Sequence, residues 1–209
     1  MSKRQRLSDG DGCVRTWVAH ERWVRAVASL GGGLVASGGG DEVCRVYDVR
    51  SGALRQTLAG HGGGVKAIAG VPDAEQPGAA CKELLTGSTD GTLKLWDLAS
   101  GEEKLSMNEH TSGVNCVAVA APGLAVSGGS DRIVRLWNID DGKQLAALEG
   151  HRDIVRCVAA ADRLKCVTGA SDSTIRVSSA AAVHPPPFPN ARPLPASLSL
   201  SLSRSRRGI

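Results

Sequence analysis

Histidine, a small hydroxyl residue and aspartate recur together along this chain, and these are the residue types of a hydrolytic catalytic triad. The four sets are His20–Ser37–Asp41, His61–Thr86–Asp90, His110–Ser127–Asp131 and His151–Thr168–Asp172. A nucleophile needs one special environment, whereas four copies indicate a role that each copy performs for itself. A buried chain of hydrogen bonds is such a role, because a buried polar group left unpaired costs about 1–3 kcal/mol. The sequence therefore predicts structural networks and no catalytic residues.

The spacing of these residues reveals an internal repeat. The turn aspartates Asp41, Asp90, Asp131 and Asp172 follow one another after 49, 41 and 41 residues. Histidine and aspartate are 21 residues apart in three units and 29 apart in the second unit, where the stretch 71–82 predicts a longer loop. A period of about 40–45 residues is typical of a repeat architecture, which outranks every local signal.

Each unit is predicted to contain four short antiparallel β-strands. The first is apolar and β-branched, as in residues 65–69, where the adjacent apolar pair Ala67-Ile68 predicts a β-bulge. The second ends at the Gly-rich turn, the third alternates as in residues 92–96, and the fourth follows a turn such as Ser100-Gly101. Four short strands in about 40 residues match one blade of a β-propeller.

These motifs resemble the WD-repeat family of β-propellers over residues 13–177. In that family, the His, the Ser or Thr, the turn Asp and a Trp of the third strand form a hydrogen-bonded tetrad in each blade. The resemblance implies two complete tetrads, His61–Thr86–Asp90–Trp96 and His110–Ser127–Asp131–Trp137. In the first unit the hydroxyl of Tyr47 is expected to replace the indole donor, and in the fourth unit Ser178 stands where Trp belongs.

The expected fold is therefore all-β, a WD-repeat β-propeller of about four blades at 20–60, 61–109, 110–150 and 151–177, the last one incomplete. Residues 13–18 align with the end of a fourth strand, and we expect them to pair with the third strand of the fourth unit. Family members usually have seven or eight blades, so four blades are expected to form a partial propeller, either an open arc or an imperfectly closed one. Its unpaired edges and apolar blade faces would favour self-association.

The two ends of the chain differ in composition from the repeats. Residues 178–209 contain seven Ser, six of the nine Pro, four Arg and no acidic residue, which predicts a disordered tail. The change falls inside a predicted strand, so we interpret the tail as read-through of non-coding sequence or a shifted frame; a natural disordered tail is the alternative. Residues 1–12 are predicted to be a disordered basic terminus.

Composition limits the other function classes. There is neither a signal peptide nor an apolar run of 18 residues, so the chain is expected to be intracellular, in cytoplasm or nucleus, without a membrane contact. The six cysteines contain no Cys-x-x-Cys pair, and buried reduced thiols are expected, with Cys44, Cys116 and Cys157 at apolar strand positions. The sequence predicts no metal site and no cofactor.

The charge distribution bears on the partners. Residues 13–177 hold 18 basic and 19 acidic side chains, so the net charge of +4 comes from the two ends. A nucleic-acid-binding fold is expected to carry its positive charge on the fold itself. We therefore predict a non-catalytic scaffold that binds proteins or peptides through the propeller face. The alternative is an RNA- or ribosome-assembly-associated protein that uses the basic termini.

Two sets of side chains are candidates for the partner surface. The residues expected to bind a partner are Trp23, Arg25, Lys66, Asn115, Ile154 and Arg156. The basic residues of the third strands are expected to form a solvated face, with a stripe for an acidic partner as the alternative; they are Arg45, Lys94, Arg135 and Arg176.

Overall fold

The computed structural model describes residues 15–73, 76, 78–161 and 165–179, and this part of the chain is built from β-strands alone. Blade 1 consists of β1 (Val24–Gly31), β2 (Leu34–Gly39), β3 (Val43–Asp48) and β4 (Leu54–Ala59). Blade 2 consists of β5 (Val65–Val71), β6 (Glu83–Ser88), β7 (Leu93–Asp97) and β8 (Glu103–Met107). Blade 3 consists of β9 (Val114–Ala121), β10 (Leu124–Gly129), β11 (Val134–Asn138) and β12 (Gln144–Leu148). Blade 4 has three strands, β13 (Val155–Ala160), β14 (Lys165–Ala170) and β15 (Ile175–Ser179).

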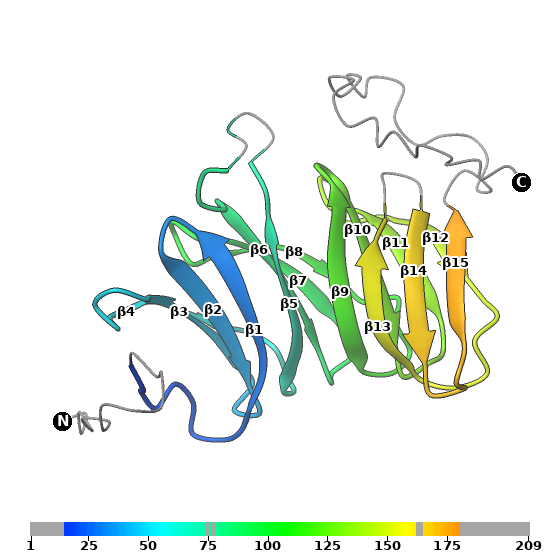
Figure 1. Cartoon of the computed structure of the whole chain (residues 1–209), viewed down its shortest axis with the longest axis horizontal. Coiled ribbons are helices and arrows are strands. Elements are labelled where there is room, and N and C mark those ends of the chain that lie inside the picture. The colour runs from blue at the N-terminus through cyan, green and yellow to red at the C-terminus, as the bar shows by residue number, and fades with distance from the viewer. Residues whose placement is uncertain (1–14, 74–75, 77, 162–164, 180–209) are drawn as a thin grey trace, which may run out of the picture.

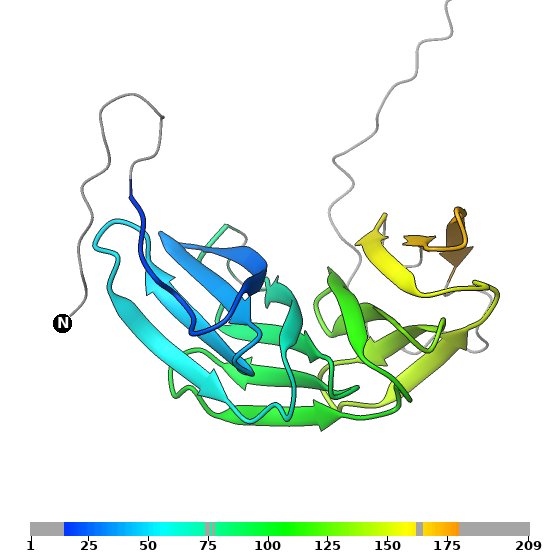
Figure 2. The same cartoon turned by 90° about the horizontal axis from the view of Figure 1, so that it is seen from below.

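Each blade is an antiparallel sheet whose strands lie in chain order, and the four blades stand side by side in an arc (Figure 1). The first strands β1, β5, β9 and β13 contact one another in sequence along the inner side of the arc (Figure 2). Blades 1 and 4 occupy the two ends of the arc, which does not close into a ring (Figure 2). The predicted all-β, partial propeller is confirmed.

The hydrophobic core lies between the blades rather than within them. One buried cluster joins blades 1 and 2, and includes Leu58 and Trp96. A second cluster joins blades 2 and 3 through residues such as Leu95 and Trp137, and a third joins blades 3 and 4. Because neighbouring sheets bury the faces that they turn toward each other, each blade depends on its neighbours for stability.

Two backbone features repeat in each described blade. In the first strand, one residue has no partner in the pairing with the second strand. In blade 2 this residue is Lys66, which lies between the paired residues Val65 and Ala67. This is the predicted β-bulge, one residue earlier than the apolar pair that suggested it. In the turn after the second strand, the residue following the aspartate has a positive φ of 65–87°, and Gly91 meets this demand most easily.

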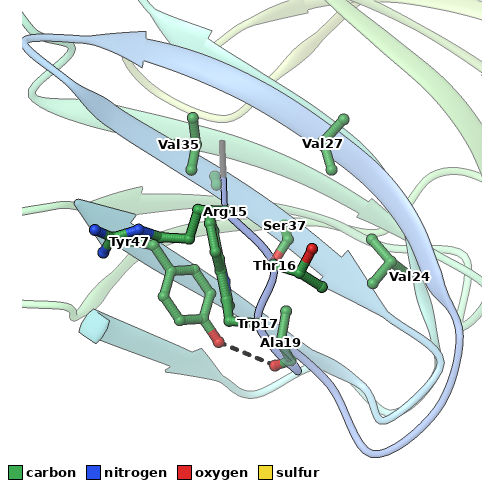
Figure 3. A pocket seen from close by; sticks show the side chains of 10 residues that line it. Arg15, Thr16, Trp17, Ala19, Val24, Val27, Val35, Ser37 and Tyr47 are labelled. Carbon is green, nitrogen blue, oxygen red and sulfur yellow. Dashed lines mark hydrogen bonds between the residues drawn. The ribbon is translucent and has the colours of Figure 1, made fainter. Parts of the chain in front are cut away.

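The N-terminal segment differs from the prediction. Residues 15–19 form no strand, and they lie against blade 1 instead of blade 4, with Trp17 beside Tyr47 at a ring-centroid distance of 5.6 Å (Figure 3). The physical reason is the open arc, which holds blade 4 away from this segment (Figure 2). At the other end, β15 continues through Ser178 and Ser179, two residues beyond the expected end of the repeats. The terminal regions 1–14 and 180–209 lie outside the described residues.

The cysteines of the described part have free thiols, but their burial differs from the expectation. Cys44 is buried between blades, and burial raises the pKa of its thiol to about 12. Cys116 is half-buried, whereas Cys157, its equivalent in blade 4, is exposed. The prediction of a buried thiol is wrong for Cys157, because no further blade in the described part of the chain covers blade 4.

Candidate functional site

The tetrad of blade 3 is a continuous chain of hydrogen bonds. The indole Nε1 of Trp137 donates to Ser127 Oγ at 2.8 Å, and Ser127 Oγ lies 2.8 Å from His110 Nε2. On the other side of the imidazole, His110 Nδ1 is 2.9 Å from the carboxylate of Asp131. This series of hydrogen bonds therefore connects the third strand to the second. It also connects both strands to the turn that contains Asp131 and to the segment that contains His110 and leads into the blade.

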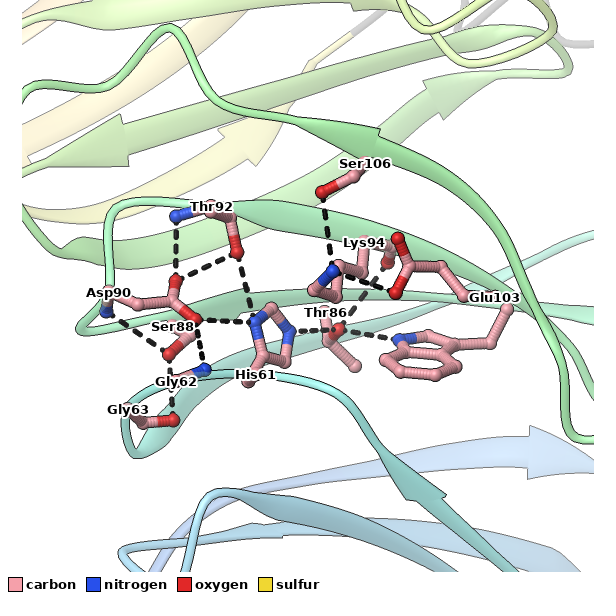
Figure 4. Close-up of polar contacts among 11 residues, drawn as sticks. His61, Gly62, Gly63, Thr86, Ser88, Asp90, Thr92, Lys94, Glu103 and Ser106 are labelled. Carbon is pink, nitrogen blue, oxygen red and sulfur yellow. Dashed lines mark hydrogen bonds and ion pairs between the residues drawn. The ribbon is translucent and has the colours of Figure 1, made fainter.

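Blade 2 has the same arrangement (Figure 4). Trp96 Nε1 donates to Thr86 Oγ1 at 2.8 Å, and Thr86 Oγ1 is 2.8 Å from His61 Nε2. His61 Nδ1 lies 3.0 Å from Asp90, whose carboxylate also accepts the backbone N–H of Gly62. The four residues that the family resemblance assigned to this tetrad are thus brought together.

The electrostatics of the tetrad favour a neutral imidazole next to an ionised carboxylate. Burial lowers the pKa of His110 more than the Asp131 carboxylate raises it, and the same holds for His61 beside Asp90. Burial by itself would raise the pKa of Asp131, but hydrogen bonds from His110 and Arg135 lower it overall. A proton on Nδ1 then donates to the carboxylate, and Nε2 accepts from the hydroxyl.

The tetrad aspartates have a further partner that alternates along the chain. In blades 1 and 3, the arginine four residues after the aspartate donates to it at 2.6 Å, from Arg45 to Asp41 and from Arg135 to Asp131. In blade 2 the residue four after the aspartate is Lys94, and in blade 4 it is the exposed Arg176. In both blades a threonine two residues after the aspartate donates instead. These hydroxyl donors are Thr92, at 2.8 Å from Asp90, and Thr174, at 2.7 Å from Asp172.

The expected solvated face of third-strand cations is therefore wrong for three of its four members. Arg135 and Lys94 are buried, and Arg45 is half-buried. Lys94 pairs with Glu103 at 2.7 Å. The side chains turn inward because buried or partly buried carboxylates are available there, and an unpaired buried charge is costly. Arg176 on β15 is exposed, as expected.

Blades 1 and 4 have incomplete networks. In blade 1, His20 bonds Asp41 at 2.7 Å and Ser37 at 2.8 Å, but the Tyr47 hydroxyl donates to the carbonyl of Ala19 at 3.0 Å (Figure 3). The expectation that this hydroxyl replaces the indole donor is wrong, because the carbonyl of Ala19 accepts it. In blade 4, His151 lies 2.9 Å from both Asp172 and Thr168, and no indole completes the set.

Four of the six predicted partner-binding residues share one structural position. They are the residues skipped by the register in the first strands, Arg25, Lys66, Asn115 and Arg156, which we call the bulge cluster. These strands line the inner side of the arc. Trp23 and Ile154 precede the bulge in their blades. Trp23 is 62% exposed. The guanidinium carbon of Arg25 lies over the Trp23 ring, 5.1 Å from the ring centroid.

The bulge cluster is connected across blades by hydrogen bonds. Lys66 Nζ donates to Asn115 Oδ1 at 3.0 Å, and Asn115 Nδ2 donates to the carbonyl of Val155 at 3.1 Å. Arg156 Nε donates to Ser171 Oγ at 2.8 Å. Burial lowers the pKa of Lys66, and the charges of Arg25 and Arg156 lower it further, so Lys66 is within electrostatic reach of both arginines.

Other site types have little support in the described part of the chain. No group of three or more His, Cys, Asp or Glu side chains there is arranged to hold a metal ion. The same residues include no helix that could cross a membrane.

The sequence did not lead us to predict the arginine and threonine partners of the tetrad aspartates. The repeated Asp–Arg spacing of four residues was available as a signal.

Comparisons with known proteins agree with this geometry. Residues 11–48, 52–97, 101–138 and 142–177 each match the WD40 family, described as WD domain, G-beta repeat. The chain is 34% identical over 100 residues to nuclear distribution protein PAC1 of Coccidioides posadasii, covering 41% of this chain and 21% of that protein. It is 36% identical over 74 residues to WD repeat-containing protein pop1 of Schizosaccharomyces pombe, covering 35% of this chain and 8% of that protein.

A third relative is the U3 small nucleolar RNA-associated protein 15 homolog of Xenopus tropicalis, 31% identical over 90 residues, with 43% of this chain and 16% of that protein covered. The chain thus spans less than a quarter of the length of these relatives. Among solved structures, 77% of the chain superposes on the computationally designed Ika4 protein with a TM-score of 0.67 and 28% identity, covering 93% of Ika4. The same share superposes on the designed Ika8 protein with a TM-score of 0.66 and 28% identity, covering 46% of Ika8. With four matched repeats and four antiparallel blades, the chain belongs to the WD40 repeat family.

Proposed function

We propose that this protein is a non-catalytic scaffold that binds other proteins or peptides through the bulge cluster. The observation that carries the proposal is the placement of Arg25, Lys66 and Arg156 at equivalent bulges of three first strands, with Lys66 within electrostatic reach of both arginines. A β-bulge re-aims one side chain out of the regular alternation of a strand. Three such cations in a group favour a partner that presents acidic side chains.

The tetrads support a structural role in place of catalysis. Ser127 and Thr86 have the hydroxyls that a nucleophile would need, and both side chains are fully buried. Each hydroxyl oxygen already receives an indole N–H at 2.8 Å. A substrate carbonyl has no route to such an oxygen, so these hydroxyl–imidazole–carboxylate sets are suited to holding the blades together.

The bulge cluster and the neighbouring Trp23 together provide the side chains that anchor interfaces. Arginine and tryptophan are enriched among the residues that dominate binding energy. Trp23 and Arg25 lie together in blade 1, and both are exposed. Because Arg25 covers the face of the Trp23 ring, the pair presents a flat apolar surface next to a positive charge.

Capture from a cell extract tests the proposal. The variant Arg25→Glu/Arg156→Glu is compared with Arg50→Glu/Lys143→Glu, which makes the same change in net charge at exposed turns between third and fourth strands. We expect the first variant to capture at least tenfold less of the proteins bound by the unaltered chain, and the second to capture them normally. Equal capture by all three chains, with unchanged melting temperatures, would contradict the proposal.

The alternative, an RNA- or ribosome-assembly-associated protein, is favoured by one observation, the similarity to a protein named as U3 small nucleolar RNA-associated. The basic termini on which it depends lie outside the described residues. Nuclease treatment of the extract separates the two functions. Partners that survive nuclease and depend on Arg25 and Arg156 support the scaffold, whereas partners lost with the RNA support the alternative. We place either activity inside the cell, in cytoplasm or nucleus.

A further inference from the structure

The junctions between neighbouring blades share one contact between a valine and a glycine. The contacts are Val65 on Gly38, Val114 on Gly87 and Val155 on Gly128. A Cβ added to the glycine would lie only 2.4–2.7 Å from a Cγ1 atom of the valine, so each valine fills the space that a side chain would occupy. All three valines are fully buried. The valine begins the first strand of one blade, and the glycine belongs to the second strand of the preceding blade.

The two halves of a fourth contact lie apart at the two ends of the arc. Val24 begins the first strand of blade 1, as the buried valines do in theirs, yet it is 49% exposed. Gly169 is the equivalent glycine of blade 4, and among the described residues only Cys157 Sγ would come within 4 Å of an added Cβ. Blades 1 and 4 end the arc on opposite sides, so one copy of the chain does not bring these residues together (Figure 2).

The surface around Gly169 is apolar and uncovered. Ile175 and Val177 on β15 are 77% and 69% exposed. Their equivalents in blade 2, Leu93 and Leu95, are 0% and 2% exposed, because blade 3 and the fourth strand of their own blade cover them. In the described part, β15 pairs only with β14, which leaves its other edge open. Blade 4 therefore presents the same kind of surface that blades 1–3 bury.

We propose that a second copy of this chain covers these ends, with Val24 of each copy packed on Gly169 of the other. The interface repeats the contacts already made between blades 1 and 2, 2 and 3, and 3 and 4. Because each copy carries both halves, two copies related by a twofold axis make two identical head-to-tail interfaces and close a ring of eight blades. Propellers of four to about eight blades are typical. This proposal concerns a surface distinct from the bulge cluster and does not rest on the proposed function.

The fit to the two designed proteins agrees with an arc that forms part of a longer structure. The same four blades that cover nearly all of Ika4 cover about half of Ika8, so an arc of this shape fits as one half of a longer chain. Closure also places residues 15–19 of one copy next to the open edge of β15 in the other. In blade 1 the equivalent position beside β3 is held by β4, which leads into His61 as residues 15–19 lead into His20. An added strand there would satisfy the open edge.

The mass of the full chain in solution tests the proposal. Light scattering is expected to give twice the chain mass of 21.6 kDa at high concentration and to approach the single mass on dilution. Val24→Asp and Gly169→Leu should each weaken the dimer at least tenfold. Val49→Asp, which also puts a charge on an exposed valine but lies in the turn after β3, should leave it unchanged. Ile175→Asp gives a second variant of the blade 4 surface, at a side chain too exposed to be needed for folding.

Mixing the variants distinguishes head-to-tail closure from nonspecific association. A dimer of one Val24→Asp chain and one Ile175→Asp chain has both defects in one interface and none in the other. The mixture should therefore associate more tightly than either variant alone, measured by energy transfer between labelled chains. A single-chain mass at all concentrations, a mixture that behaves like its components, or species larger than two copies would each overturn the proposal.

Discussion

The indole Nε1 of Trp137 donates to Ser127 Oγ at 2.8 Å, and both side chains are completely buried in blade 3. The hydroxyl of Ser127 in turn faces His110 at 2.8 Å. The small Ser127 side chain thus forms hydrogen bonds with two large side chains, Trp137 and His110, that come from different parts of the blade. Removing any member leaves buried polar atoms without partners, which makes the tetrad sensitive to single substitutions.

Trp137→Phe and Trp96→Phe should each lower the free energy of unfolding by about 1–3 kcal/mol, because the hydroxyl partner loses its indole donor and the smaller ring leaves space. His110→Ala should cost a similar amount. Trp23→Phe serves as the control, since this exposed ring is expected to contribute no more than about 0.5 kcal/mol. Chemical denaturation measures all four. An unchanged unfolding midpoint in Trp137→Phe would show that the indole hydrogen bond contributes nothing to stability.

Arg135→Gln should destabilise the protein by about 1.5–3 kcal/mol, because it removes a charge-assisted hydrogen bond to the buried carboxylate of Asp131. The equivalent substitution in blade 4, Arg176→Gln, removes an exposed side chain and should change stability by less than about 0.5 kcal/mol. Thermal unfolding of the two variants makes the comparison. Equal effects at the two positions would mean that Arg135 does not act through the tetrad.

Gly128 and Val155 should be energetically coupled. Gly128→Ala places a Cβ about 2.4 Å from Val155 Cγ1, and such overpacking costs about 1–3 kcal/mol. Val155→Ala removes buried methyl groups and should cost about 2 kcal/mol. In the double variant the new methyl at 128 occupies the vacated space, so its loss of stability should be at least about 0.5 kcal/mol smaller than the sum. A double-mutant cycle by denaturation measures this difference, and additive losses would contradict the valine–glycine contact.

Stability should fall as the pH is lowered, in two stages. Burial lowers the pKa values of His61 and His110 in the folded protein, whereas the unfolded chain titrates near 6.5. The unfolded state therefore binds more protons as the pH drops below about 6.5, and the contribution of the two histidines is lost from there downward. A second loss is expected below about pH 3.8, because hydrogen bonds hold the pKa of Asp41 at about 2. Melting temperatures that stay constant between pH 7.5 and 5 would contradict the neutral, buried imidazoles.

Much of the architecture was predictable because each repeat encodes the same structure independently. The spacing of the histidines and turn aspartates placed the units in register, and the alternation in the third strands identified them as strands. Both features report local backbone geometry and burial, which the chain repeats four times. The family resemblance and the all-β, partial propeller are confirmed on this basis.

Predictions that depended on one side chain choosing among partners were less successful. Tyr47 was expected to serve the tetrad of blade 1, but its hydroxyl donates to the carbonyl of Ala19. Arg135 was expected in solvent, but it turns to Asp131. Alternation along a strand indicates which residues share a face. It does not indicate which acceptor a long or polar side chain will reach.

The sequence by itself determined the repeat, the strands, and the identity of the four hydrogen-bonded sets, because those depend on residue type at regular spacing. Only the tertiary structure decided how the blades meet. In blades 1–3, the glycine that follows the small hydroxyl residue is needed because a valine of the next blade occupies the space above it. The two residues are 27 apart in the chain, as Gly38 and Val65 are. The exposure of Val24 and Ile175 likewise depends on which blades are present beside them, and no local pattern reports the presence of a neighbour.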